Sequence, residues 1–251
     1  MSYAGNPPPP PPPPGPPGGY GGFGGPSAPP PGGYPAPQQY DVMVAVNYGW
    51  AKFQAYAGQM ILAALAIFAG ALVIGAVRVV AILLPADDGL TVGSVIALVA
   101  LYVAFFIYAQ VVGAGLIREA LGVTEGRPFS TAGVFRFDHF GKVLATSLLV
   151  GLGTLIGTIL CILPGIVFGF MSMYALYFVI ERGMGPVDAI GASIDLVKNN
   201  LSPTIIWYLI AMVIVFVGEL ACFVGLLVAI PVVLVGSAYT YKRLTGQPVA
   251  P

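Results

Sequence analysis

Residues 55–84 read AYAGQMILAALAIFAGALVIGAVRVVAILL, and Arg78 is the one charged residue among them. About 20 consecutive apolar residues are enough for an α-helix to cross a bilayer, so this stretch predicts a membrane-spanning helix. Working outward from it along the chain, we find five further apolar stretches and expect them to span as well, at about 92–117, 142–162, 165–180, 204–221 and 223–241. The predicted fold is an all-α, polytopic helical membrane bundle of six spans within residues 55–243.

The composition of the whole chain agrees with this prediction. Of its 251 residues, 57% are hydrophobic and 8% are charged, whereas a typical soluble domain carries about 25% charged residues. Ten Lys and Arg residues balance ten Asp and Glu residues, so no basic field exists to attract nucleic acid. We therefore exclude a soluble domain and a nucleic-acid partner, and we expect the lipid bilayer as the main surroundings.

Residues 1–40 form a different kind of segment, with eight consecutive prolines at Pro7–Pro14 and no charged side chain. Such a run favours polyproline II, and the segment cannot bury enough apolar surface to fold alone. We expect a disordered Pro/Gly/Tyr-rich cytoplasmic tail. Three interpretations stay open: a spacer, a ligand for an aromatic-lined groove on a protein partner, or a Tyr/Gly segment that self-associates.

The distribution of basic residues predicts the topology. If the tail is cytoplasmic, one side of the membrane receives nine of the ten basic residues, namely Lys52, Arg118, Arg127, Arg136, Lys142, Arg182, Lys198, Lys242 and Arg243. Cytoplasmic loops of membrane proteins carry such an excess of Lys and Arg. We expect a multi-pass protein of a bacterial cytoplasmic membrane with both termini in the cytoplasm, residues 244–251 forming the C-terminal tail.

Two segments next to the membrane have a recognisable pattern. Residues 41–54 contain Tyr48, Trp50 and Lys52, which are typical of an anchor at headgroup level. Residues 185–199 predict an amphipathic helix, with Pro186 at its first position and an apolar stripe at Val187, Ile190, Ile194 and Val197.

The polar residues of that helix have two interpretations. Asp195 and Lys198 can pair at a spacing of three residues. Packing is the expected role of the helix, and a binding role for Ser193 or Asp195 is the alternative.

The start of the fifth predicted span also has a recognisable pattern. Ser202 followed by Pro203 is typical of a helix N-cap and first position.

Within the spans, ionisable residues usually mark transport pathways, and here they are scarce. Arg78 and Glu219 lie near expected helix ends, and Gln110 is the most polar residue near the centre of a span. Pro231 lies inside the sixth span and is expected to kink it.

The single histidine, His139, follows Asp138 in an aromatic loop and is either a pH-sensitive group or part of a solvated interfacial loop. The sequence lacks the spacings of zinc, nucleotide-binding and hydrolase motifs. We therefore predict no enzyme and assign no catalytic, cofactor-binding or metal-binding residue. Cys161 and Cys222 lie in similar GxxxC contexts, 157–161 and 218–222, and whether they form a disulfide is left open.

Small residues recur four apart in the spans, at Ala66/Gly70, Ala71/Gly75, Gly153/Gly157, Gly165/Gly169 and Ala221/Gly225. Such pairs allow helices to approach closely. They indicate tight packing within the chain, or for one pair a homo-oligomer contact.

Four motifs carry a resemblance: residues 48–53 (YGWAKF), 161–165 (CILPG), 185–200 (GPVDAIGASIDLVKNN) and 238–248 (AYTYKRLTGQP). Over residues 40–248 the chain resembles actinobacterial proline- and glycine-rich transmembrane proteins, which are similar to six-span bacterial membrane proteins of unknown function. The resemblance implies the same architecture and a Pro/Gly tail, and it implies no catalytic or binding residue. Leu201-Ser202-Pro203 departs from the pattern, where a plainer helix entry is expected.

Our leading functional hypothesis is a non-enzymatic assembly, accessory or scaffold protein of the bacterial cell envelope. The envelope role comes from the resemblance alone. The alternative is a transporter or channel for a small or lipid-like substrate, using a cavity around Gln110 and Pro231.

Overall fold

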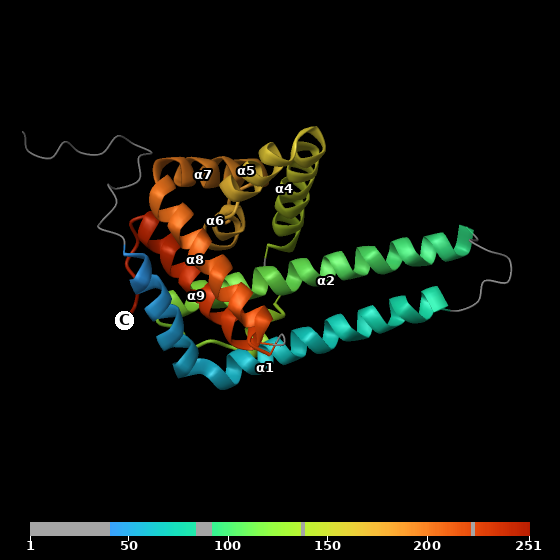
Figure 1. Cartoon of the computed structure of the whole chain (residues 1–251), viewed down its shortest axis with the longest axis horizontal. Coiled ribbons are helices and arrows are strands. Elements are labelled where there is room, and N and C mark those ends of the chain that lie inside the picture. The colour runs from blue at the N-terminus through green and yellow to red at the C-terminus, as the bar shows by residue number, and fades with distance from the viewer. Residues whose placement is uncertain (1–40, 84–91, 137–138, 222–223) are drawn as a thin grey trace, which may run out of the picture. The chain divides into compact units, whose positions relative to one another are not determined.

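Every regular element among the described residues is an α-helix (Figure 1). A computed structural model describes residues 41–83, 92–136, 139–221 and 224–251, which belong to one compact unit. Its helices are α1 (Val42–Leu83), α2 (Val92–Thr124), α3 (Thr131–Val134), α4 (Phe140–Leu160), α5 (Ile162–Met171), α6 (Ala175–Arg182), α7 (Pro186–Asn199), α8 (Leu201–Leu220) and α9 (Leu226–Leu244). The predicted all-α fold is confirmed, and the predicted tail at 1–40 lies outside the described residues.

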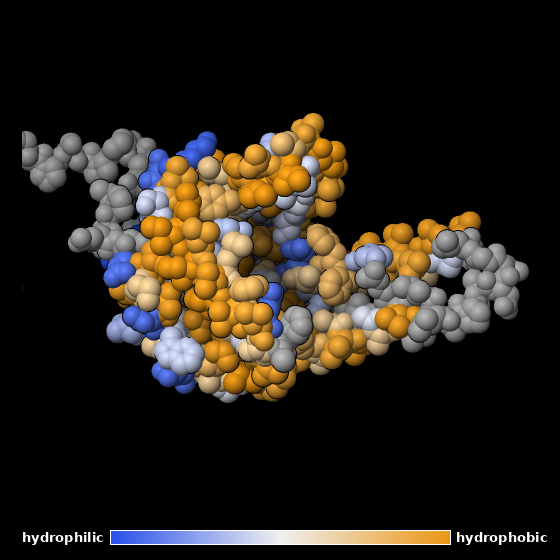
Figure 2. Space-filling view, in the orientation of Figure 1, coloured by the Kyte–Doolittle hydropathy of each residue, from blue (hydrophilic) through white to orange (hydrophobic). Residues whose placement is uncertain are grey.

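Six segments are long and apolar enough to cross a membrane: Val42–Val77, Val92–Thr124, Phe140–Leu160, Ile162–Arg182, Leu201–Leu220 and Leu226–Leu244. They match the six predicted spans one for one. Large apolar side chains cover much of the molecular surface, as Figure 2 shows for one face. Because water would penalise this surface, it indicates a membrane protein and is consistent with contact between these helices and a lipid bilayer.

The first span begins earlier than the sequence predicts. Helix α1 starts at Val42, where the Asp41 carboxylate accepts a hydrogen bond from the Met43 N–H at 2.8 Å. The backbone leaves helical geometry at Tyr56 (φ −120°, ψ 20°). Helix α1 therefore runs through most of the segment 41–54 and of the predicted span, as two helical parts joined by a kink close to their expected boundary.

The fourth predicted span, 165–180, corresponds to the segment Ile162–Arg182, but this segment is not one continuous helix. It is divided into α5 and α6 by a turn at 172–174. The Ser193 hydroxyl of α7 accepts a hydrogen bond from the Tyr174 N–H at 3.1 Å and donates one to the Met171 carbonyl at 2.7 Å. A side chain from another helix thus satisfies backbone groups that the interrupted helix leaves open.

Helix α7 confirms the predicted amphipathic segment but not its apolar stripe. The buried face consists of Ala189, Ser193, Leu196 and Val197, while Val187 is 73% exposed. The face is rotated because α7 packs against α4 and α6 and directs Ser193 into the break between α5 and α6. The predicted N-cap at Ser202 is also wrong, since α8 begins at Leu201 with Asn200 at the cap position.

The core is arranged around α9, which packs against α1, α2 and α8. The Tyr241 ring lies among Tyr174, Tyr177 and Phe178, with centroid separations of 5.2–5.9 Å. Helix α9 continues through Pro231, so the expected kink does not interrupt it. At Gly49 and Gly236 the helices approach so closely that a Cβ atom would overlap Val232 and Trp207, respectively.

Two hairpins, α4–α5 and α8–α9, use the predicted small residues in the same way. A Cβ atom on Gly157 would lie 2.8 Å from the backbone nitrogen of Gly165, and one on Gly225 would lie 2.8 Å from the Cα atom of Gly218. Each GxxxC glycine therefore packs against a glycine on the returning helix. This agreement supports the similarity between the two segments that the sequence indicates.

Candidate functional site

The most densely connected polar group surrounds Lys242 near the end of α9. Its ammonium nitrogen donates to Oε1 of Glu125 at 2.8 Å, to Oε1 of Gln247 at 2.9 Å and to Oε1 of Glu181. The Lys242 side chain is only 4% exposed. A lysine ammonium has three donors, so these three acceptors use all of them. We call Glu125, Glu181, Lys242 and Gln247 the Lys242 cluster.

Glu181 is the second centre of the Lys242 cluster. Its Oε2 accepts hydrogen bonds from the Tyr241 hydroxyl at 2.6 Å and from the Gln247 amide at 3.1 Å, and Arg182 lies 3.6 Å away. Charge-assisted hydrogen bonds of this kind are stronger than neutral ones. The Glu181 carboxylate therefore joins α6, the end of α9 and the segment that follows α9.

Glu125 lies just beyond α2 and is more exposed. Its Oε2 accepts a hydrogen bond from Arg127 at 2.9 Å, and its Oε1 accepts the one from Lys242. Burial raises the pKa of the Glu125 carboxyl, but the hydrogen bonds and charges of Lys242 and Arg127 outweigh burial and hold it below its ordinary value of 4.5. The carboxylate thus stays ionised and serves as an acceptor.

The last residues of the chain continue this network. The Ala250 N–H donates to the Thr124 carbonyl at 2.8 Å, and the Tyr48 hydroxyl donates to the Ala250 carbonyl at 3.0 Å. Lys52 donates to the main-chain oxygen of Pro251. The ends of α1, α2, α6 and α9 are therefore tied together at one place. In chemical terms, the arrangement pairs the charge of Lys242 with carboxylates of opposite charge and holds the ends of these helices together.

The sequence analysis identifies Lys242 as a topology signal but does not single out Glu125 or Glu181, and it does not reveal that the three meet. Glu125, Glu181 and Lys242 lie far apart in the chain, and no spacing rule connects them. One feature of the sequence could have indicated the contact: each of the three residues lies at the end of an apolar span. Charged residues at the ends of several spans lie at the same depth relative to the membrane.

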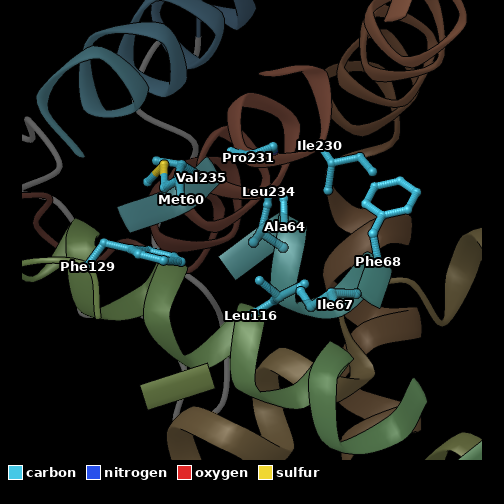
Figure 3. Close-up of a pocket in the computed structure, with 10 residues that line it drawn as sticks. All are labelled: Met60, Ala64, Ile67, Phe68, Leu116, Phe129, Ile230, Pro231, Leu234 and Val235. Carbon is cyan, nitrogen blue, oxygen red and sulfur yellow. The ribbon is translucent and has the colours of Figure 1, made fainter. Parts of the chain in front are cut away.

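A second feature is an apolar cavity of about 120 Å³ between α1, α2 and α9 (Figure 3). It is lined by Met60, Ala64, Ile67, Phe68, Leu116, Phe129, Ile230, Pro231, Leu234 and Val235. The sequence predicts a cavity near Gln110 and Pro231, and the structure brings only Pro231 to it. Gln110 is partly buried elsewhere on α2.

The other polar residues that the sequence singles out do not gather into a site. Glu219 and Cys161 are exposed, and Cys161 has a free thiol. His139 adopts a left-handed conformation (φ 54°) immediately before α4. Asp138, Cys222 and the Arg78 side chain lie outside the described part of the structure. In the described ranges, no three His, Cys, Asp or Glu side chains gather as metal ligands.

Comparison with known proteins gives three mycobacterial relatives. The uncharacterized protein Rv2560 of Mycobacterium tuberculosis (strain H37Rv) is 35% identical over 242 residues, which cover 88% of this chain and 74% of the relative. The chain belongs to its family. The uncharacterized protein Mb2590 of Mycobacterium bovis has the same identity and coverage, and MT2637 of Mycobacterium tuberculosis (strain CDC 1551) is 34% identical. The actinobacterial part of the resemblance is therefore confirmed.

No protein-family model matches the chain. No solved structure matches it either.

Proposed function

We propose that the protein is a non-enzymatic scaffold or accessory protein of the bacterial cell envelope. The observation that carries this proposal is the Lys242 cluster, where both carboxylates, the buried lysine and the Gln247 amide hold the chain's own helices together. A polar network used in this way makes the end of the bundle rigid. A rigid end of the bundle suits a protein that presents a docking surface to partners.

We place this end of the bundle in the cytoplasm of a bacterial cell, together with both termini. The support is that basic residues assigned to one side by the sequence also come together in the structure. Lys242 and Arg127 both contact Glu125, Arg182 lies by Glu181, and Lys52 reaches Pro251. Such clustering follows the positive-inside rule.

The partners that we propose are proteins recruited through the Pro-rich segment, and a second copy of the chain. Of the five small-residue pairs, Ala71/Gly75 is the candidate for self-association, because a Cβ atom on Gly75 would meet nothing within 4 Å. Gly157, Gly165, Gly218 and Gly225 are already used inside the chain.

Affinity purification from native membranes tests the scaffold role. We would compare the full chain with a variant lacking residues 2–38 and with Lys198→Met, which alters an exposed lysine outside the Lys242 cluster. The proposal expects envelope proteins that copurify with the full chain and with Lys198→Met and are lost from the shortened variant. Identical sets of copurifying proteins from all three would contradict recruitment through the tail.

A transporter or channel for a small or lipid-like substrate is the second candidate. The cavity lined by Pro231 favours it, because transporters bind substrates between spans where helices are interrupted or contain proline. Liposomes that contain only this protein would show substrate-dependent flux if it transports. Flux abolished by filling the cavity would replace the scaffold proposal with this one.

A further inference from the structure

The cavity between α1, α2 and α9 has walls without hydrogen-bonding side chains. Its ten lining residues are aliphatic, aromatic, proline or methionine. A buried water needs two to four polar partners, and these side chains offer none. The cavity therefore favours an apolar occupant over water.

The cavity is large enough for a short piece of hydrocarbon. Its volume is about 120 Å³, and an apolar cavity of roughly 150 Å³ in another protein stays dry and binds benzene. Several carbons at the end of an alkyl chain need a comparable space. A whole lipid does not fit, so its remaining part must stay outside.

The two ends of the cavity differ. Met60, Phe129 and Val235 are buried at one end, whereas Phe68 and Ile230 are each 40% exposed at the other (Figure 3). Phe68 and Ile230 belong to membrane-spanning segments, so the groups that face this entrance are the acyl chains of the bilayer.

We propose that this cavity binds the end of one acyl chain of a bilayer phospholipid, which enters between Phe68 of α1 and Ile230 of α9. A phospholipid fits because its polar headgroup stays outside the apolar walls. A methylene group that moves from water into an apolar site contributes about 0.8 kcal/mol. An acyl chain that moves from lipid into the cavity does not leave water, so it gains mainly contacts with the cavity walls. The bound lipid fills space between three helices, a role that goes beyond the scaffold function and requires no transport.

Photolabelling in nanodiscs tests this site. The discs would contain phosphatidylcholine with a diazirine at the end of one acyl chain, and labelled peptides would be identified by mass spectrometry after irradiation. We expect adducts on residues 60–68 and 230–235 to exceed those on the lipid-facing stretch 95–106 of α2 by about tenfold, because a bound chain dwells against the cavity walls. Labelling spread evenly over the spans would overturn the proposal.

Three variants make the test specific. Ala64→Phe fills the cavity and should reduce its labelling about tenfold, whereas Ala69→Phe adds the same side chain at an exposed position of α1 and should leave it unchanged. Leu234→Ala enlarges the cavity and should increase labelling. If Ala64→Phe does not fold, the response of Leu234→Ala decides, and no increase overturns the proposal.

A competition experiment identifies the source of the chain. Excess unlabelled phosphatidylcholine should remove the adducts in proportion to its dilution of the probe. If palmitic acid at much lower concentration removes them, a free fatty acid is the ligand and the phospholipid assignment is wrong. Neither result depends on which proteins copurify, so the scaffold proposal and this one fail separately.

Discussion

At the scale of single residues, two glycines of α2 that lie two positions apart have opposite surroundings. A Cβ atom on Gly115 would overlap the carbonyl group of Val134, whereas one on Gly113 would meet nothing within 4 Å. The overlap is with backbone and cannot be relieved by rotating a side chain. Gly115 therefore sets the closest distance between α2 and the segment containing α3.

We expect Gly115→Ala to destabilise the protein by about 2 kcal/mol, the usual cost of forcing an extra methyl group into a packed interior. The matched variant Gly113→Ala should be neutral or slightly stabilising, because alanine is the better helix former. Thermal unfolding of the purified variants in detergent measures the difference. Equal midpoints for the two variants would contradict the close approach.

Lys242 is the residue on which the polar cluster depends. We expect Lys242→Met to destabilise the protein by about 3 kcal/mol, because it removes the buried cation from the carboxylate of Glu181, 12% exposed, and leaves it only the more distant Arg182 at 3.6 Å. Adding Glu181→Gln to that variant should restore part of the loss, since the unpaired charge is then removed. Lys198→Met, at an exposed position of α7, serves as the control and should unfold like the wild type.

Glu125 gives the cluster a dependence on pH. Its pKa is lowered in the folded protein from the ordinary value of 4.5, so its contribution to stability is complete above that value. The contribution is lost as pH falls from about 4.5 through the lower folded pKa, because the folded state must then accept a proton. Unfolding midpoints measured from pH 6 downward should therefore fall less steeply for Glu125→Gln than for the wild type. Parallel curves would show that Glu125 does not contribute.

At the scale of elements, the fourth span and α7 stabilise each other. The turn between α5 and α6 interrupts the helical hydrogen bonds inside a buried region, and Tyr174 and Ser193 are both fully buried there. The Ser193 hydroxyl serves as acceptor for one open backbone group and donor for another. Helix α7, which lies outside the spans, therefore supplies hydrogen bonds that the span interrupted between α5 and α6 lacks.

We expect Ser193→Ala to cost about 1–3 kcal/mol, the usual penalty for a buried backbone donor left without a partner. Hydrogen exchange followed by mass spectrometry should show faster exchange across residues 171–178. Ser202→Ala, at an exposed position in the first turn of α8, is the matched control. A Ser193→Ala variant with the stability and exchange of this control would contradict the role of Ser193.

At the scale of the whole molecule, if all six candidate segments cross the membrane, the beginning of α1 and the end of α9 lie on the same side of it. The contacts of Ala250 with Thr124 and Tyr48 agree with an even number of spans, since they bring the C-terminal residues to the beginning of α1 and the end of α2.

We predict that a reporter fused after Pro251 is active when it is a type that works only in the cytoplasm. A reporter that works only outside should be active when the fusion point is moved into residues 84–91, between the first two spans. Assays of the two reporter types at both positions, in intact bacteria, measure this. External activity at both fusion points would require an odd number of spans, whereas external activity after Pro251 with cytoplasmic activity at 84–91 would show that the orientation is inverted.

Some features of this fold can be predicted from the sequence and others cannot. The six apolar segments and the boundary between residues 54 and 55 follow from runs of apolar residues and from changes in their polarity, which are local properties, whereas the bend at Tyr56 is seen only in the structure. The break at 172–174 could not be predicted, because the residues on either side are as apolar as the rest of the span. The buried face of α7 was predicted with the wrong rotation, because apolar periodicity does not count a serine as a core residue.

The sequence by itself determined that the chain forms helices apolar enough to enter a membrane, how many such helices there are among the described residues and where most of them lie. These properties depend on how each segment partitions between water and lipid, and each segment carries that information alone. Only the tertiary structure decided that Lys242 meets Glu125 and Glu181, that Ser193 closes a broken span, and that a cavity opens beside Phe68 and Ile230. Each of these depends on contacts between residues distant in the chain, and such contacts exist only after the helices have packed.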